Sequence, residues 1–303
     1  MATMTEATQA VSAVLPSHNY HANAHVLMGH LQRPIEQKIE PQAPVELHDR
    51  RGGHLVRFSE GVSIEGLISY TKGQTRVSGS RSLKSNGWIT LSTSILEGLN
   101  VFEVITADRV VSQVSTEHPY ENGHIPRVTF LGTQFNNLRV GGLPVTLTLD
   151  LGICGERPVD DTSYLSDLPF LSKASEQARS IADMEGLPKE LKQQYDEKLA
   201  SIEKLMSTSD EDRRGQEPKI TCSLVQSIGA ISLPGVKSFG HILVIPEFGT
   251  VALGEVEVGE KMYADSTKPC NYFEVSLIKM KLGCIGTGNT QVATAAANGH
   301  TAP

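Results

Sequence analysis

The sequence lacks the short motifs that mark several large enzyme classes. It has no G-x-x-x-x-G-K-[S/T], no G-x-G-x-x-G that opens a helix, and no G-x-S-x-G. These motifs position phosphates, dinucleotides and serine nucleophiles. Their absence gives no support to ATP-dependent, dinucleotide-dependent or α/β-hydrolase chemistry. The sequence therefore favours a protein without catalytic activity.

Paired cysteines and long apolar runs are also missing. Cys154, Cys222, Cys270 and Cys284 stand far apart and never as C-x-x-C, which excludes zinc ribbons and thioredoxin-like sites. The N-terminus has no positively charged segment followed by an apolar one, so we expect no signal peptide. No run approaches the roughly 18 apolar residues of a membrane span. We expect a cytoplasmic protein with reduced thiols and no membrane insertion.

Positive charge and aromatic residues are scarce. The chain has 27 Lys and Arg against 34 Asp and Glu, a formal charge of −7, which argues against nucleic acid as a partner because such binding needs clustered cations. Aromatic residues make up 5% of the chain, with Trp88 the single tryptophan. With 39% hydrophobic and 20% charged residues, the composition is that of a globular protein.

What the sequence does contain is mainly β pattern. In the segment VTLTLDL, residues 145–151, apolar residues alternate with Thr and Asp, which predicts a strand with one buried face. Asn86-Gly87 precedes another alternating run and predicts a hairpin, because both turn positions favour positive φ.

A helical pattern interrupts the β pattern between residues 160 and 217. A short helix is expected over about 170–184, and a longer one follows Pro188, which suits a first helical turn. The longer helix has one apolar stripe at spacings of four and three: Leu191, Tyr195, Leu199, Ile202 and Met206. We expect a helical hairpin inserted between two β-segments.

Those two β-segments share a succession of landmarks. Both read Gly-His-Ile, six residues, Gly-Thr, eight residues and Gly, starting at Gly123 and Gly240. The shared order favours duplication over chance matching. His124 and His241 then become paired residues. Each is expected to hydrogen-bond within its own module, with a shared ligand site between the modules as the alternative.

These patterns predict a mainly β protein of β-sandwich or jelly-roll type, with two related β-modules and an inserted α-helical hairpin. The expected divisions are an extended N-terminal arm over 1–53, β-module 1 over 54–158, the helical hairpin insertion over 159–217, β-module 2 over 218–285 and a disordered tail over 286–303.

Two groups of histidines could bind a metal. The loop TEHPYENGH brings His118, Glu121 and His124 within a few positions, a set that a divalent ion could use if the loop folds back. A polar loop without metal is the competing interpretation, since no diagnostic spacing is present. The N-terminal group is His18, His21, His25 and His30, which packing and hydrogen bonds alone could hold.

Two classes of function follow. The first is a non-catalytic β-protein that forms homo-oligomers or binds another partner through strand edges and exposed loops, with no cofactor. The alternative is a metal-dependent enzyme or metal-binding protein on a jelly-roll or cupin-like scaffold, using His118, Glu121 and His124 or the N-terminal histidines.

Overall fold

Strands make up most of the residues that the structure describes, as the alternating pattern predicts. The computed structural model describes residues 17–82, 87–120, 124–159, 162–208, 212–213, 216–264, 266, 268–283 and 286–302. It has 56% strand and 14% helix, with antiparallel sheets that form a β-sandwich. The predicted fold class is confirmed.

The first layer, sheet A, contains both ends of the described chain. Its strand order is β15-β16-β17-β18-β19-β1-β2, with β13 also paired to β17 and β3 to β1. The strands are β1 (Ser17–Arg33), β2 (Gln37–Ile39), β3 (Val45–Asp49), β13 (Lys219–Ser223), β15 (Lys237–Phe239), β16 (Ile242–Ile245), β17 (Gly249–Lys261), β18 (Cys270–Leu282) and β19 (Thr287–Ala302).

The second layer, sheet B, comes from one continuous part of the chain. Its order is β11-β10-β7-β6-β5-β4, with β8 and β9 also paired to β7. The strands are β4 (Gly53–Ile64), β5 (Ile68–Arg81), β6 (Trp88–Val101), β7 (Ile105–His118), β8 (Arg127–Thr129), β9 (Gln134–Asn136), β10 (Arg139–Val140) and β11 (Leu143–Pro144). A separate ladder joins β12 (Leu147–Leu149) to β14 (Val225–Ile228).

The predicted hairpin at residues 86–87 joins β5 to β6, which pair from Arg81↔Trp88 onward, although Asn86 itself lies outside the described residues. The β4–β5 turn shows why such reversals need particular residues. Glu65 and Gly66 both have positive φ, 49° and 71°, a conformation that glycine adopts without strain.

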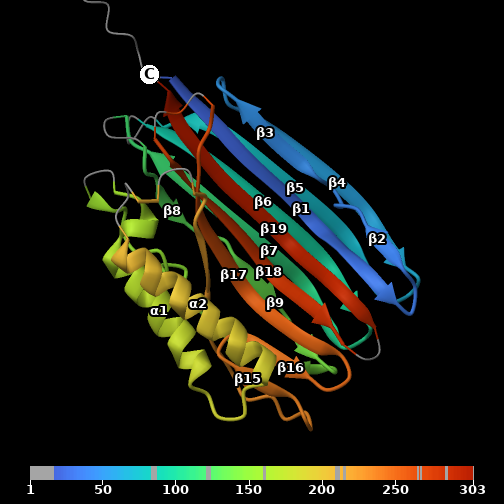
Figure 1. Cartoon of the computed structure of the whole chain (residues 1–303). Coiled ribbons are helices and arrows are strands. Elements are labelled where there is room, and N and C mark those ends of the chain that lie inside the picture. Colours follow the sequence, from blue (N-terminus) through green and yellow to red (C-terminus); the bar gives the residue numbers. More distant parts are fainter. Residues whose placement is uncertain are drawn as a thin grey trace, which may run out of the picture.

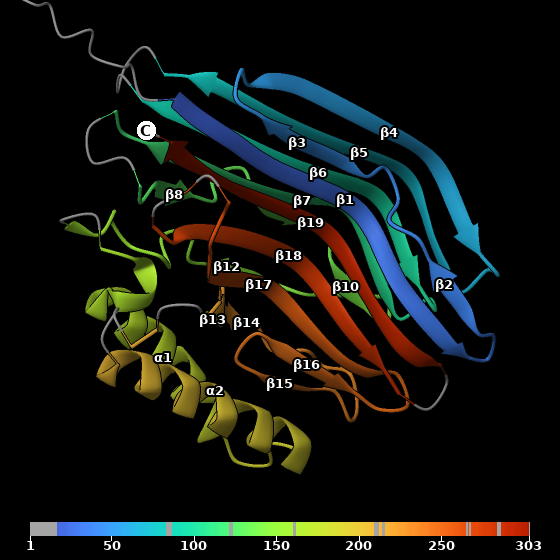
Figure 2. The same ribbon diagram turned by 45° about the horizontal axis from the view of Figure 1, so that its top comes forward.

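The two sheets lie face to face and approach closely (Figures 1 and 2). The hydroxyls of Ser92 and Ser94 on β6 donate to the backbone carbonyls of Asn23 and His25 on β1, at 2.7 and 2.8 Å. A serine side chain of one sheet can reach the backbone of the other only where small side chains let the two sheets approach closely. The rest of the interior is mainly apolar, and its bulkiest fully buried residues include Phe130, Tyr164, Phe170, Tyr195 and Phe273.

The helical hairpin packs against sheet A, on the side of the sandwich opposite β4 (Figures 1 and 2). It consists of α1 (Leu168–Ala182) and α2 (Lys189–Ser207), close to the predicted bounds. The Asp167 side chain caps α1 by accepting from the Phe170 N–H at 3.0 Å. Neither described helix combines the length and apolar character needed to cross a bilayer.

The predicted apolar stripe of α2 is buried within the same chain, with one difference. Tyr195 and Ile202 are each 2% exposed, but the last buried position is Leu205 and not Met206. Met206, Leu191 and Leu199 are partly buried beside the core. The stripe turns slowly around the helix because 3.6 residues per turn do not divide evenly into its spacings.

Both ends of the predicted domain division need correction. The extended arm over 1–53 contains β1, and the disordered tail over 286–303 contains β19. These strands pair with each other from Ser17↔Ala302 to Arg33↔Thr287, at the centre of sheet A. β19 also pairs with β18, so both of its edges are hydrogen-bonded. Residues 1–16 lie outside the described chain.

The landmarks of the sequence repeat fall on different elements. Gly249-Thr250 opens the long strand β17, whereas Gly132-Thr133 lies in the turn before the three-residue strand β9. Sheet B is built from β-module 1, while sheet A combines strands of β-module 2 with strands from both ends. The duplication therefore stays an inference from sequence order.

Candidate functional site

The histidine candidates of the 118–124 loop point to different surroundings. His118 ends β7 and is fully buried between the sheets, where its ring lies 4.7 Å from that of His18. His18 in turn stacks on Trp88 at 5.1 Å. His124 is half-buried before β8, and Glu121 lies outside the described residues. The structure brings His118 together with His18, a pairing that the sequence spacing did not predict.

Both imidazoles of this pair are neutral at pH 7. Burial lowers the pKa of His118, and it lowers the pKa of His18 to about 3, with neighbouring histidines adding to the effect. The Gly299 carbonyl opposes the shift at His118. The ring nitrogens of His18 have no hydrogen-bond partner among the described residues. Within the described chain no three His, Cys, Asp or Glu residues form a group that could hold a metal ion. The metal site stays a prediction.

His21, a third N-terminal histidine, is held by packing and hydrogen bonds. His21 lies between the rings of His48 and Tyr263, at 4.2 and 4.4 Å. A chain of contacts runs from Asn19 through His300 to His21, at 3.0 and 3.2 Å. This arrangement fixes the end of β1 against β19 and β3.

A cleft lies between α2 and sheet A. It encloses about 790 Å³ and has both apolar and charged walls. An exposed ion pair joins Glu190 of α2 to Lys281 of β18 at 3.6 Å, across its rim. Residues along its walls and floor include Met28, Leu191, Tyr195, Glu255, Lys279 and Gln291.

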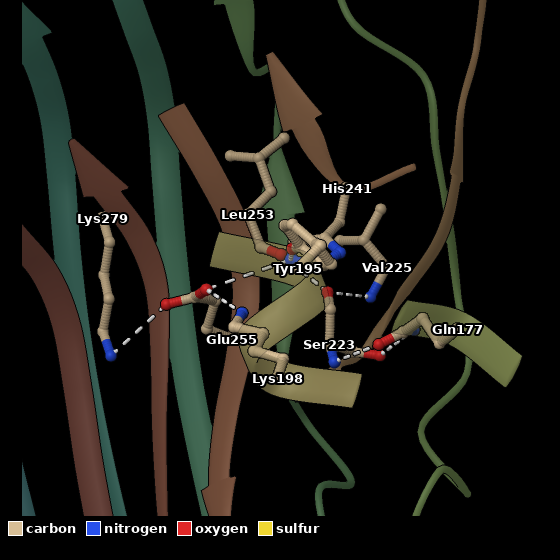
Figure 3. Close-up of polar contacts among 9 residues, drawn as sticks. All are labelled: Gln177, Tyr195, Lys198, Ser223, Val225, His241, Leu253, Glu255 and Lys279. Atoms are coloured by element: carbon tan, nitrogen blue, oxygen red, sulfur yellow. Dashed lines mark hydrogen bonds and ion pairs between the residues drawn. The ribbon is translucent and has the colours of Figure 1, made fainter. Parts of the chain in front are cut away.

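The floor of this cleft is a charge cluster centred on Glu255 of β17 (Figure 3). One carboxylate oxygen lies 3.8 Å from the Lys198 ammonium of α2, and the other lies 3.5 Å from that of Lys279 of β18. His241 lies 3.9 Å from the first oxygen, and its Nε2 is 3.2 Å from the Tyr195 hydroxyl. Helix and sheet are thereby joined through one buried carboxylate.

The protonation states in this cluster follow from burial and charge. Burial would raise the pKa of Glu255, but His241 and the two lysines lower it to about 2. Burial lowers the pKa of His241 despite the nearby carboxylate, and burial raises the pKa of Tyr195. At pH 7 the cluster is an ionised carboxylate with two ammonium groups, a neutral imidazole and a neutral phenol.

A second connection joins the hairpin to the sheet. The Gln177 side chain of α1 donates to the Ser223 carbonyl at 3.0 Å and accepts from the Ser223 N–H at 2.7 Å (Figure 3). Its amide thereby extends the backbone ladder of β13. Sequence reasoning missed Gln177 and Glu255 because their partners come from distant segments, with no local spacing to reveal them.

The edge of sheet B is the most exposed β-surface of the molecule that the structure describes. β4 pairs with β5 from Gly53↔Gly79 to Ile64↔Ile68, and within the described chain no strand pairs with its other edge. Phe58 is 73% exposed and Leu55 is 38% exposed. The strand contains no proline and no lysine, residues that commonly protect such edges.

Comparison with known families gives one match. A family model covers residues 18–259, from β1 into β17, which is more than half of the chain. The chain belongs to the family described as Domain of unknown function (DUF8256). The matched range includes β4, the helical hairpin and Glu255, and it ends before β18. No curated protein and no solved structure matches the chain.

Proposed function

We propose that the protein is a non-catalytic assembly protein that forms homodimers by pairing β4 with the β4 of a second copy. The observation that supports this is the edge itself, twelve residues long, unpaired on one side among the described strands and exposed along its length. A free strand edge presents backbone donors and acceptors that another strand can satisfy.

The twofold symmetry of such a pairing restricts which residues of the two strands can lie opposite each other. Two identical strands related by a twofold axis run antiparallel, and opposite residues must face the same side of the joined sheet. The register centred on Phe58 meets this condition and places Phe58 opposite Phe58 of the second copy. It also places His54 opposite Val62 of that copy, so nearly all of β4 takes part.

The exposed fraction of Phe58 sets an upper bound on the free energy that its burial contributes to this contact. Fully burying a phenylalanine side chain stabilises by about 1.5–3 kcal/mol, so burying the exposed 73% of Phe58 contributes about 1–2 kcal/mol per copy. A cross-strand aromatic pair adds about 0.2–1 kcal/mol. If both copies bury Phe58 fully, loss of this contribution weakens dimerisation by about thirtyfold or more, and partial burial gives a smaller effect.

Light scattering after size exclusion tests the proposal over micromolar concentrations. We expect a species of twice the chain mass of 32.8 kDa, which Phe58→Lys shifts to monomer. Leu131→Lys is the matched control, because Leu131 is 65% exposed but lies in a turn outside β4. A wild-type monomer at every concentration, or equal effects of the two variants, would contradict the proposal.

The alternative function is a metal-dependent enzyme or metal-binding protein. It is supported by the neutral imidazole of His18, whose ring nitrogens have no partner among the described residues, since neutral imidazole is the form that binds metals. Elemental analysis of untagged protein tests it. Stoichiometric Fe, Mn, Ni or Zn that disappears in His118→Ala would favour this function over assembly.

The proposed location is the cytoplasm. Cys154 and Cys222 are free and buried, which suits a reducing compartment, and Cys284 lies outside the described residues. Fractionation of cells that express the full chain tests this expectation. Recovery in a membrane or extracellular fraction would contradict it.

A further inference from the structure

A second cleft lies on the face of sheet A that points away from sheet B. It encloses about 380 Å³. The ladder sets His21, Asn298 and Tyr272 side by side, while their neighbours Ala297 and Phe273 turn toward the core. We call this the acidic cleft, after the residues that characterise it: Glu46, Glu217, Glu274 and Asn298.

The acidic cleft is rich in hydrogen-bond acceptors. Three carboxylates line it, from β3, from the segment before β13 and from β18. Asn298 lines it as well and is only 6% exposed. Its Nδ2 donates to the Tyr263 hydroxyl, but its Oδ1 has no hydrogen-bond partner among the residues that the structure describes. A buried acceptor without a donor costs free energy, which a ligand with N–H groups would recover.

The charges around this cleft are mostly negative. Lys261 is the one ammonium or guanidinium group among the lining residues that the structure describes, against three carboxyls. Burial raises the pKa of Glu274, and repulsion from Glu257 adds to this, although Lys279 and Lys219 act in the opposite direction. Burial also raises the pKa of Tyr272, with nearby carboxylates adding to it. The other titratable groups that face the cleft are His21, His48 and Tyr263.

The geometry favours an organic cation over a metal ion. No three acidic or metal-ligating side chains in the described chain converge closely enough to hold an ion. The volume lies within the range of about 300–1,000 Å³ that is usual for small-molecule sites. The Lys261 ammonium already lies 5.6 Å from the centre of the Tyr263 ring, so the aromatic wall accepts a cation.

We propose that the acidic cleft binds a small organic cation with several N–H donors, of the diamine or polyamine class. Its ammonium groups pair with the separated carboxylates, and one N–H supplies the missing donor to Asn298 Oδ1. Lys261 competes for the same charges, because it is the cation already present. This site is independent of β4 and of dimerisation.

Calorimetry on the full chain tests the site, with spermidine as the probe, 1,8-octanediol as a neutral probe of similar reach and CaCl₂ as the metal probe. We expect saturable binding of spermidine alone. Glu274→Gln and the exposed-site variant Glu217→Gln should each weaken it by about tenfold or more. Lys261→Met should strengthen it.

Glu190→Gln is the matched control, since Glu190 is an exposed carboxylate of the other cleft. It should leave spermidine binding unchanged. Weakening by Glu190→Gln equal to that by Glu217→Gln would show only general charge attraction and overturn the proposal. Absence of spermidine binding at millimolar concentration, equal binding of octanediol, or tighter binding of Ca²⁺ would also overturn it.

Discussion

Replacing Glu255 by glutamine tests whether the buried carboxylate holds the helical hairpin to the sheet. The pKa of Glu255 falls from its ordinary 4.5 to about 2 in the folded protein. Each pKa unit corresponds to about 1.4 kcal/mol, so ionised Glu255 stabilises the fold by about 3 kcal/mol at pH 7. The side chain is only 13% exposed, so solvent screens little of this. Glu255→Gln should therefore lower the free energy of unfolding by about 3 kcal/mol.

The pH dependence of this effect has a defined sign. Because the folded pKa lies below the unfolded one, the contribution of Glu255 is complete above about pH 5 and disappears as the pH falls toward about 2. The gap between wild type and Glu255→Gln should close over that range. Urea titrations at several pH values, followed by the fluorescence of the single tryptophan, Trp88, measure this gap.

Glu190→Gln provides the comparison, because its partner Lys281 is also exposed and such surface pairs contribute at most about 1 kcal/mol. A Glu255→Gln variant as stable as wild type at pH 7 would refute the reasoning. A gap that stays constant between pH 7 and pH 2 would refute the assignment to the carboxylate charge.

Two further stability predictions use the same urea titration. Ile202→Ala should lower the free energy of unfolding by about 2–5 kcal/mol, because Ile202 is buried against the sheet. Leu199→Ala should lower it by less, because Leu199 is only partly buried. Equal losses in the two variants would contradict the observed buried face of α2. Gly249→Ala should cost at least about 1–3 kcal/mol, since φ is 124° and an added Cβ would lie 2.2 Å from the Lys281 carbonyl oxygen; an unchanged unfolding midpoint would contradict this.

Features encoded by local pattern could be predicted from the sequence. The helical hairpin follows from a 3.6-residue period in a charged segment. Asn86-Gly87 predicts the reversal between β5 and β6, which do pair, although Gly87 does not have the positive φ on which that prediction rests. Both signals come from contacts between residues close in sequence.

β19 shows why other parts could not be predicted. Its sequence, TGNTQVATAAANGHTA, is small and polar, which resembles a disordered tail. In the fold, small residues are what the site requires, because sheet A and sheet B approach within reach of serine hydroxyls. Strands β1 and β18 provide the hydrogen bonds that stabilise it. Because β1, one of its two partners, lies at the other end of the chain, no local sequence pattern indicates this strand.

The candidate sites could not be predicted from the sequence for the same reason. The sequence groups His118 with Glu121 and His124 as a candidate metal site. In the fold, the ring of His118 lies beside that of His18 from the opposite sheet. In the sequence Glu255 is one polar residue of a β-segment, and it lies between Lys198 and Lys279 only in the folded chain. Sequence spacing cannot reveal residues that meet across two layers.

Amide hydrogen exchange along β4 is the most direct test of assembly through this strand. We expect residues 53–64 to become protected as protein concentration rises through the dimerisation range. Phe58→Lys should abolish this protection while leaving β5 and β6 unchanged. Exchange in 53–64 that is independent of concentration, even in samples whose mass has doubled, would contradict pairing through β4.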